Sequence, residues 1–431
     1  MAARQSSFSI YRALVFAATV YTVASWIFLL DNNLLSQADR FQESDYIMTF
    51  YVAGHLAANG RSNELYPESD ARSFIDSPFD KAAHALLPHL PKSTTGAYMY
   101  IPLVAGFFAP FSFVGPNLSL FFWQTLSVLA LALCCLLFSR LTAVKTSDAF
   151  FLSFLYAPVF LTLWAGQLGL GLGLLPLAIG YFLLIKERPL AAGLVWSLLL
   201  LKPQYFFAAA FVSLACAAAG RYRTFFAMSL GSILLVGLTI AVFSPSVTMQ
   251  WLLSHKVSDV YFFEGLQGIP NHLITGLPAN LLTLLPVDER RAVKLPLYAG
   301  AALAWLFGLW FCFRLRKAPV QESTQVSLAF VVALFLSALT MPHLLYYDLC
   351  VLLPAGFLLL AKNGPLPTDK VLRFIGASGW IAVSAFLPFL LTFTKYKTLP
   401  LLLEIILLSL FFILLWNLDR RFRLATRAVT G

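Results

Sequence analysis

Long apolar runs separated by short polar breaks make up most of this chain. Several runs reach ~18 residues or more, the length that an α-helix needs to cross ~30 Å of hydrocarbon. The pattern predicts an all-α polytopic membrane protein with about twelve transmembrane helices. The expected crossings lie at about residues 10–30, 118–139, 147–165, 168–186, 189–201, 203–219, 223–243, 294–313, 323–341, 344–362, 370–393 and 398–418.

Two longer polar stretches interrupt this pattern, and we predict that both are loops on the outer side of the membrane. The first covers residues 31–117 and the second covers residues 244–293. Within the first, residues 45–59 have apolar side chains at helical spacing, which is typical of a helix that lies in the membrane interface. No soluble domain or internal repeat is evident, so residues 1–431 are expected to form a single integral membrane domain.

Residues 98–113 can be placed in two ways, and the choice sets the orientation of everything that follows. They are apolar enough to cross the membrane, but they are short and contain Pro102 and Pro110. If they cross, Lys145 and Lys186 face outward; if they are re-entrant or interfacial, both face inward together with the two termini. The excess of basic residues in cytoplasmic loops favours the second alternative, and irregular backbone is tolerated where protein covers it.

The composition agrees with a membrane protein and excludes a nucleic-acid partner. The chain is 59% hydrophobic and 12% charged, whereas a soluble chain carries about 25% charged residues. The net charge of +10 comes from Lys and Arg residues that stand singly or in pairs at the ends of apolar runs. That placement orients helices in a bilayer, and the cluster at residues 420–423 is expected to meet anionic lipid headgroups.

The first candidate for chemistry is Asp45, at the start of the predicted interfacial helix. An aspartate there can cap the helix, but Ser44 can do so equally, which would leave Asp45 free to face a cleft. Glu43 and Asp45 together could hold a divalent cation, but two carboxylates without further oxygen ligands make a poor site. We therefore predict no metal, and the absence of a Gly-x-x-x-x-Gly-Lys-Ser/Thr segment argues against direct use of ATP.

Two polar breaks between apolar helices supply further candidates. Gly166 explains a tight turn by itself, so the neighbouring Gln167 needs a partner. Lys202 interrupts an apolar stretch together with Pro203 and Gln204. A lysine within a membrane is costly and suggests function, although it could instead extend its ammonium to the interface.

Late polar residues cluster around a predicted helix start. His343, Tyr346 and Tyr347 would share one helix face at spacings of three and four residues. Asp348 follows one turn deeper and needs a partner at that depth, as does Glu404 in the last helix. A transporter usually places polar residues near the midplane, whereas here they fall on the outer side. Those on the outer side or at its boundary are His55, His84, His89, His255, His272, His343, Gln167, Lys202, Asn271 and Asp348.

These features occur in a familiar order along the chain. An acidic residue starts the first outer loop, a Tyr-x-Pro closes it, and a Gly-Gln turn and a Lys-Pro-Gln break follow. An asparagine in the second outer loop and a Pro-His before a late helix complete the series. The set resembles glycosyltransferase family 87, the polyprenyl-phosphate-mannose-dependent mannosyltransferases of the GT-C superfamily.

The resemblance implies roles for individual residues. Asp45 would be the catalytic residue, and the other matching positions would bind the substrate or the donor phosphate. Two positions depart from the family pattern: His272-Leu273 follows Asn271 where a small hydroxyl residue is expected, and Asn280 stands where an arginine usually does. The expected binding residues are Tyr100, Gln167, Lys202, Asn271, His272, His343 and Tyr346.

The resemblance also implies a GT-C-like bundle and a reaction. The protein would be a cell-envelope hexosyltransferase in a bacterial cytoplasmic membrane, with its active site outside and both termini cytoplasmic. It would move mannose or another hexose from a polyprenyl-phosphate donor to a lipid or glycan acceptor, with inversion. The alternatives are a transporter or flippase of lipid-linked saccharides, or a structural membrane subunit.

Overall fold

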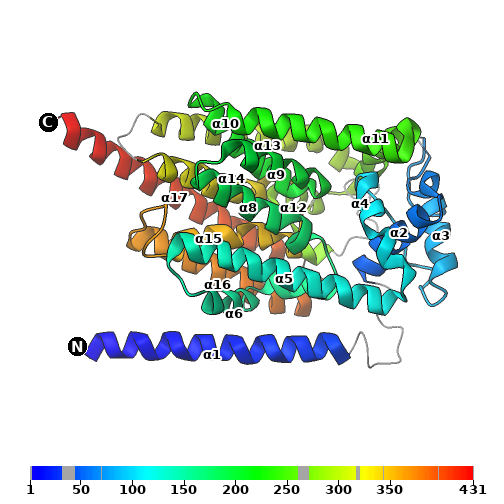
Figure 1. Cartoon of the computed structure of the whole chain (residues 1–431), viewed down its shortest axis with the longest axis horizontal. Coiled ribbons are helices and arrows are strands. Elements are labelled where there is room, and N and C mark those ends of the chain that lie inside the picture. The colour runs from blue at the N-terminus through cyan, green and yellow to red at the C-terminus, as the bar shows by residue number, and fades with distance from the viewer. Residues whose placement is uncertain are drawn as a thin grey trace.

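Helices account for nearly all regular structure in the computed structural model (Figure 1). Seven helices among the described residues are long and apolar enough to span a membrane, or eight if the pair α6 and α7, bent by 72°, forms one span. This confirms the all-α polytopic class. The structure describes residues 2–31, 44–68, 70–260, 271–316, 321–342, 344–396 and 398–430.

The seven long helices correspond to predicted crossings. They are α1 (Ala2–Leu30), α5 (Pro116–Thr142), α11 (Arg223–Ser258), α13 (Val287–Leu315), α14 (Glu322–Thr340), α16 (Lys370–Thr392) and α17 (Leu399–Thr430).

The remaining predicted crossings are helices that are shorter or broken. Proline occupies the first turn of α7, α9, α10 and α15, where its missing N–H costs nothing and its fixed φ favours a fresh start. The breaks matter because polar side chains emerge from them. The segments are α6 (Thr146–Phe154), α7 (Ala157–Ala165), η5 (Gly169–Leu174), α8 (Leu175–Ile185), α9 (Pro189–Ser197), η6 (Leu198–Leu201), α10 (Pro203–Ala218), η9 (Tyr346–Leu352) and α15 (Leu353–Leu360).

The described part of the first loop forms a compact unit at the end of the molecule opposite both termini (Figure 1). It has its own hydrophobic core, in which Phe108 packs edge-on against Trp123 of α5, with ring centroids 5.0 Å apart. Residues 98–113 contain no long helix, and α4 packs against α2 and α11; that they do not cross stays a prediction. The elements are η2 (Tyr46–Tyr51), α2 (Val52–Ala58), η3 (Ser62–Glu64), α3 (Pro78–Leu86), α4 (Pro102–Phe108) and η4 (Ala109–Phe113).

The helix predicted over residues 45–59 is present as η2 followed by α2. Its apolar positions Tyr46, Phe50 and Leu56 are at most 1% exposed. They are covered by protein, because α4, η4 and α5 pack against this segment.

The second polar stretch is more helical than predicted. Helix α11 continues past the expected end at residue 243, with a kink at Ser244, whose φ is 80° just before Pro245. After residues outside the described part come η8 (Asn271–Leu273), β1 (Ile274–Thr275) and α12 (Leu277–Thr283).

Strand β1 pairs antiparallel with β2 (Leu344–Leu345). The helix predicted to open beside His343 therefore begins at Tyr346 instead, while His343 itself lies outside the described residues. Two extended residues intervene because their backbone is used for pairing with β1.

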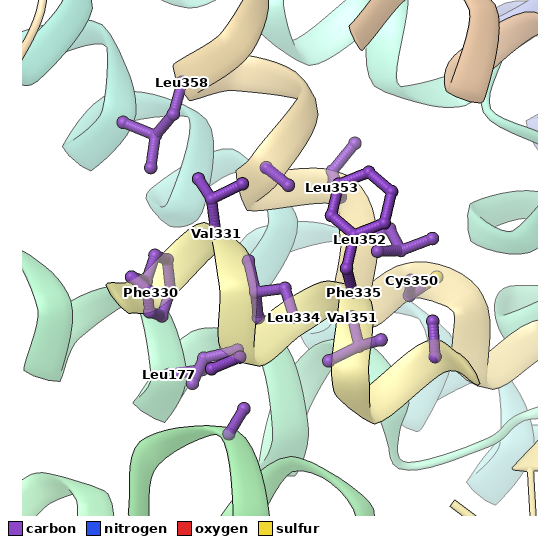
Figure 2. Close-up of a cluster of buried hydrophobic side chains, with 14 of the residues drawn as sticks. Leu177, Phe330, Val331, Leu334, Phe335, Cys350, Val351, Leu352, Leu353 and Leu358 are labelled. Atoms are coloured by element: carbon purple, nitrogen blue, oxygen red, sulfur yellow. The ribbon is translucent and has the colours of Figure 1, made fainter. Parts of the chain in front are cut away.

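The main core forms around α14, and 89% of the residues in the most apolar part of this helix are buried. Figure 2 shows Phe330, Val331 and Leu334 of α14 in one cluster with Leu177 of α8 and with Val351 and Leu358 of the η9–α15 segment. In lipid, packing and interhelical hydrogen bonds hold helices together. Both occur where the Tyr181 ring stacks on Phe330 at 4.2 Å and its hydroxyl lies 2.6 Å from Ser327 Oγ.

Candidate functional site

Asp45 is free to act on something other than its own helix. Ser44 Oγ accepts a hydrogen bond from the backbone amide of Ile47 at 3.2 Å, whereas the Asp45 side chain makes no cap bond. The Asp45 carboxylate instead accepts hydrogen bonds from Gln167 Nε2, 2.8 Å from Oδ2, and from the Tyr347 hydroxyl. Of the two sequence alternatives, the structure shows the one in which Ser44 is the cap.

The turn after α7 carries Gln167 to Asp45. Gly166 has φ of +67°, and a Cβ there would lie 2.4 Å from Tyr46 Cβ, so a larger residue would be strained and would collide with η2. The backbone N–H of Gln167 donates to the backbone oxygen of Thr162 at 2.9 Å, which closes the turn. The glutamine predicted to need a partner finds it in Asp45.

Lys202 lies between η6 and α10 and forms a buried ion pair. Its Nζ is 2.9 Å from Asp348 Oδ1, and the two side chains are 1% and 3% exposed. The other Asp348 oxygen accepts a hydrogen bond from the Leu345 amide at 3.2 Å. Lys202 is thus held inside the protein, and the alternative that it extends to the interface is wrong.

Two tyrosines surround the Lys202 ammonium. Lys202 Nζ donates to the Tyr100 hydroxyl at 3.4 Å and lies 5.6 Å from the centroid of that ring. It lies 5.9 Å from the centroid of the Tyr347 ring, whose hydroxyl binds Asp45. Tyr347 therefore links the carboxylate to the ion pair, and the site joins residues from five separate segments of the chain.

The site holds two carboxylates and one ammonium. Burial raises the pKa of Asp45 above its ordinary value, and the neighbouring Asp348 adds to this. Hydrogen bonds from Gln167 and Tyr347 and the positive charge of Lys202 act in the opposite direction. A carboxyl whose basicity is increased by burial, next to a fixed cation, suits proton removal beside a developing anion.

Of the residues predicted to form the site, the structure brings together Asp45, Tyr100, Gln167 and Lys202. The Tyr346 hydroxyl instead donates to the backbone oxygen of Val383. His272 lies in η8, which packs against α16 and α17, and burial lowers its pKa. Glu43, His343 and the side chain of Asn271 lie outside the described part of the chain.

Sequence reasoning named Tyr347 and Asp348 but did not include them among the site residues. The signal for Asp348 was present, since a carboxylate inside a helix pair needs a partner and Lys202 needed one as well. No such signal separates Tyr347 from Tyr346. Among the described residues, no group of three or more His, Cys, Asp or Glu side chains could hold a metal ion.

The fold and the site together define a polytopic membrane protein with an acid–lysine centre at the breaks between helices. Residues 98–342 match the model of glycosyltransferase family 87. The match covers more than half of the chain, and the chain belongs to this family and is a glycosyltransferase. Comparison with curated proteins gave no match, and comparison with solved structures gave none either.

The matched region contains Tyr100, Gln167 and Lys202 but neither acid of the site. Asp45 precedes it and Asp348 follows it. The hydrogen bond from Gln167 and the ion pair with Lys202 join both acids to the matched region.

Proposed function

We propose that this glycosyltransferase moves a hexose, mannose being the first choice, from a polyprenyl-phosphate donor to a hydroxyl of a lipid or glycan acceptor. The observation that carries the proposal is the carboxylate of Asp45, held by Gln167 and Tyr347 beside the buried ammonium of Lys202. A carboxylate and a cation side by side match the two demands of the reaction, removal of a proton and stabilisation of a departing phosphate.

In the proposed step, the acceptor hydroxyl attacks the anomeric carbon of the donor. Asp45 takes the hydroxyl proton as the new carbon–oxygen bond forms. The bond between the anomeric carbon and the phosphate oxygen breaks, and its electron pair stays on the phosphate. Polyprenyl phosphate leaves with an additional negative charge, which Lys202 stabilises as a point charge.

Attack from the face opposite the departing phosphate inverts the anomeric configuration. The expected product therefore carries the anomer opposite to that of the donor. The step requires no metal ion, because the ammonium of Lys202 already offers a positive charge to the leaving group.

We place the reaction at the extracytoplasmic face of a bacterial cytoplasmic membrane, with both termini in the cytoplasm. Asp45 and Tyr100 belong to the first-loop unit, which lies at the end of the molecule opposite both termini (Figure 1). Arg140 lies in the last turn of α5, the end of that helix away from this unit (Figure 1), which agrees with the excess of basic residues in cytoplasmic loops.

The test is an assay of the purified protein in lipid nanodiscs, with radiolabelled mannosyl polyprenyl phosphate as donor and extracted envelope lipids as acceptors. We expect a labelled product of inverted configuration by NMR. Asp45→Asn keeps the shape of the side chain and removes the base, so turnover should fall by about 10²–10⁴-fold.

Ser44→Ala is the matched control, since it removes the cap one residue away. It should cost roughly 1 kcal/mol of stability and leave turnover per folded molecule unchanged. Near-normal turnover of Asp45→Asn would refute its role as base. Movement of the donor across the bilayer of proteoliposomes, without product, would favour a flippase instead.

A further inference from the structure

Glu404 is a buried carboxyl in α17 that the proposed reaction does not use. It has no exposed surface, and its Oε1 accepts a hydrogen bond from the backbone amide of Gly276 at 2.9 Å. A carboxyl within an apolar helix is costly and is kept for a reason. Here it binds the backbone of the second loop, which identifies the partner that the sequence left unknown.

Gly276 is fixed in a conformation that points its amide at Glu404. Its φ is +93°, and a Cβ would lie 2.4 Å from the backbone oxygen of Met341, at the end of α14. Glycine is therefore the residue that fits between α14 and α17 here. The position directly follows β1, so Glu404 anchors one end of that strand.

Strand β1 in turn holds the segment that carries Asp348. Thr275 pairs with Leu344 and Ile274 pairs with Leu345. A pair of two-residue strands is marginal without outside support, so the anchor at Gly276 matters for its order. The Leu345 amide donates to Asp348 Oδ2 at 3.2 Å, and Asp348 Oδ1 lies 2.9 Å from Lys202 Nζ.

We propose that Glu404 is a positioning residue for the Lys202 ammonium, acting through Gly276, the β1–β2 pair and Asp348. The proposal rests on the proposed function in one respect, namely that the ammonium receives the donor phosphate. The series of contacts runs from α17 to the break between η6 and α10 without interruption. Loss of the hydrogen bond to Gly276 would leave Asp348 and Lys202 less well ordered.

Two substitutions of Glu404 separate the hydrogen bond from the charge. Glu404→Gln keeps an amide oxygen that accepts from Gly276, while Glu404→Leu keeps the bulk and removes the acceptor. The matched control is Asn417→Leu, since Asn417 is also a buried polar residue of α17 and donates to Asp369 Oδ2 at 3.3 Å instead.

The first measurement is hydrogen–deuterium exchange of peptides covering residues 274–276 and 344–348, which requires no substrate. We expect faster exchange of both peptides in Glu404→Leu and wild-type exchange in Glu404→Gln and Asn417→Leu. Unchanged exchange in Glu404→Leu would overturn the proposal, whatever the substrate of the enzyme is.

The second measurement is the donor dependence of transfer. A small misplacement of a catalytic group can cost about 10²-fold, so Glu404→Leu should lower the kcat of donor transfer by about tenfold or more, with a smaller change in the KM for the donor. Glu404→Gln should restore both values. Wild-type kcat despite faster exchange would refute the link to Lys202, as would an equal loss of kcat in Asn417→Leu. Failure of the wild-type protein to use the donor would refute the proposed function and leave the exchange result standing.

Discussion

Removing one partner of the Lys202–Asp348 pair should destabilise the protein more than removing both. At 2.9 Å two unit charges attract by roughly 6 kcal/mol at an effective dielectric constant of about 20. Part of this offsets the loss of hydration, and breaking a buried pair typically costs about 3–5 kcal/mol because one charge is left alone. We expect Lys202→Met and Asp348→Asn each to fall in that range.

The double variant Lys202→Met/Asp348→Asn leaves no unpaired charge in the pair, and asparagine still offers an oxygen to the Leu345 amide. Its loss of stability should be smaller than that of either single variant. Equilibrium unfolding in detergent micelles would give the coupling free energy from the four proteins. Donor transfer should stay low in the double variant, because the cation for the phosphate is gone.

An exposed pair provides the control. Arg221 pairs with Glu322, and these side chains are 29% and 67% exposed, so removing one of them should cost about 0–1 kcal/mol. If the losses in unfolding free energy of Lys202→Met and Asp348→Asn simply add up in the double variant, the argument that the two charges stabilise each other is wrong. Full transfer activity in the double variant would refute the role of Lys202 in phosphate binding.

Three further predictions concern the site and the membrane topology. Because the pKa of Asp45 is raised above its ordinary value of 3.8, the base becomes protonated as pH falls through that raised value. The acid limb of kcat/KM should therefore lie above pH 3.8. It should move to higher pH in Tyr347→Phe, because the hydrogen bond from Tyr347 lowers the pKa of Asp45 and the variant lacks it. An acid limb at the same pH in Tyr347→Phe would show that Asp45 is not the group that titrates. Gly166→Ala should lower folded yield or turnover, since its Cβ meets Tyr46 at 2.4 Å, and wild-type behaviour of both would contradict the close contact. A single cysteine at Lys145 should react with impermeant maleimide only in opened cells if residues 98–113 do not cross; labelling in intact cells would reverse the topology.

Local signals in the sequence were sufficient to locate the seven long helices and the breaks at residues 166–167 and 202–203. Proline at position 203 removes a backbone donor and glycine at position 166 adopts positive φ, and both effects act within a few residues. Lys202 and Gln167 could therefore be placed at helix breaks from the sequence. Their partners could not, because Asp348 and Asp45 are distant in the chain and only the packing of helices brings them near.

The sequence indicated Tyr346 as a site residue, whereas the structure places Tyr347 there, and the cause is again a long-range contact. Leucines at 344 and 345 read as the start of an apolar helix, but their backbone pairs with β1. This changes the helix phase by making Tyr346 the first helical residue. The Tyr346 hydroxyl then meets Val383 and the Tyr347 hydroxyl meets Asp45. A long-range strand pair of two residues leaves no periodicity from which the sequence could have predicted it.

The Lys202–Asp348 pair also constrains how a donor could bind. An ammonium that already has a carboxylate at 2.9 Å offers a phosphate less attraction than a free one, which weakens binding of the singly charged donor. The leaving phosphate carries one more negative charge, so the same ammonium gains more from it than from the donor. An interaction that strengthens as the bond breaks lowers the barrier, whereas equal binding of both states would not. A lysine whose positive charge is balanced by a carboxylate before the reaction is therefore better suited to stabilising the transition state than to binding the substrate tightly.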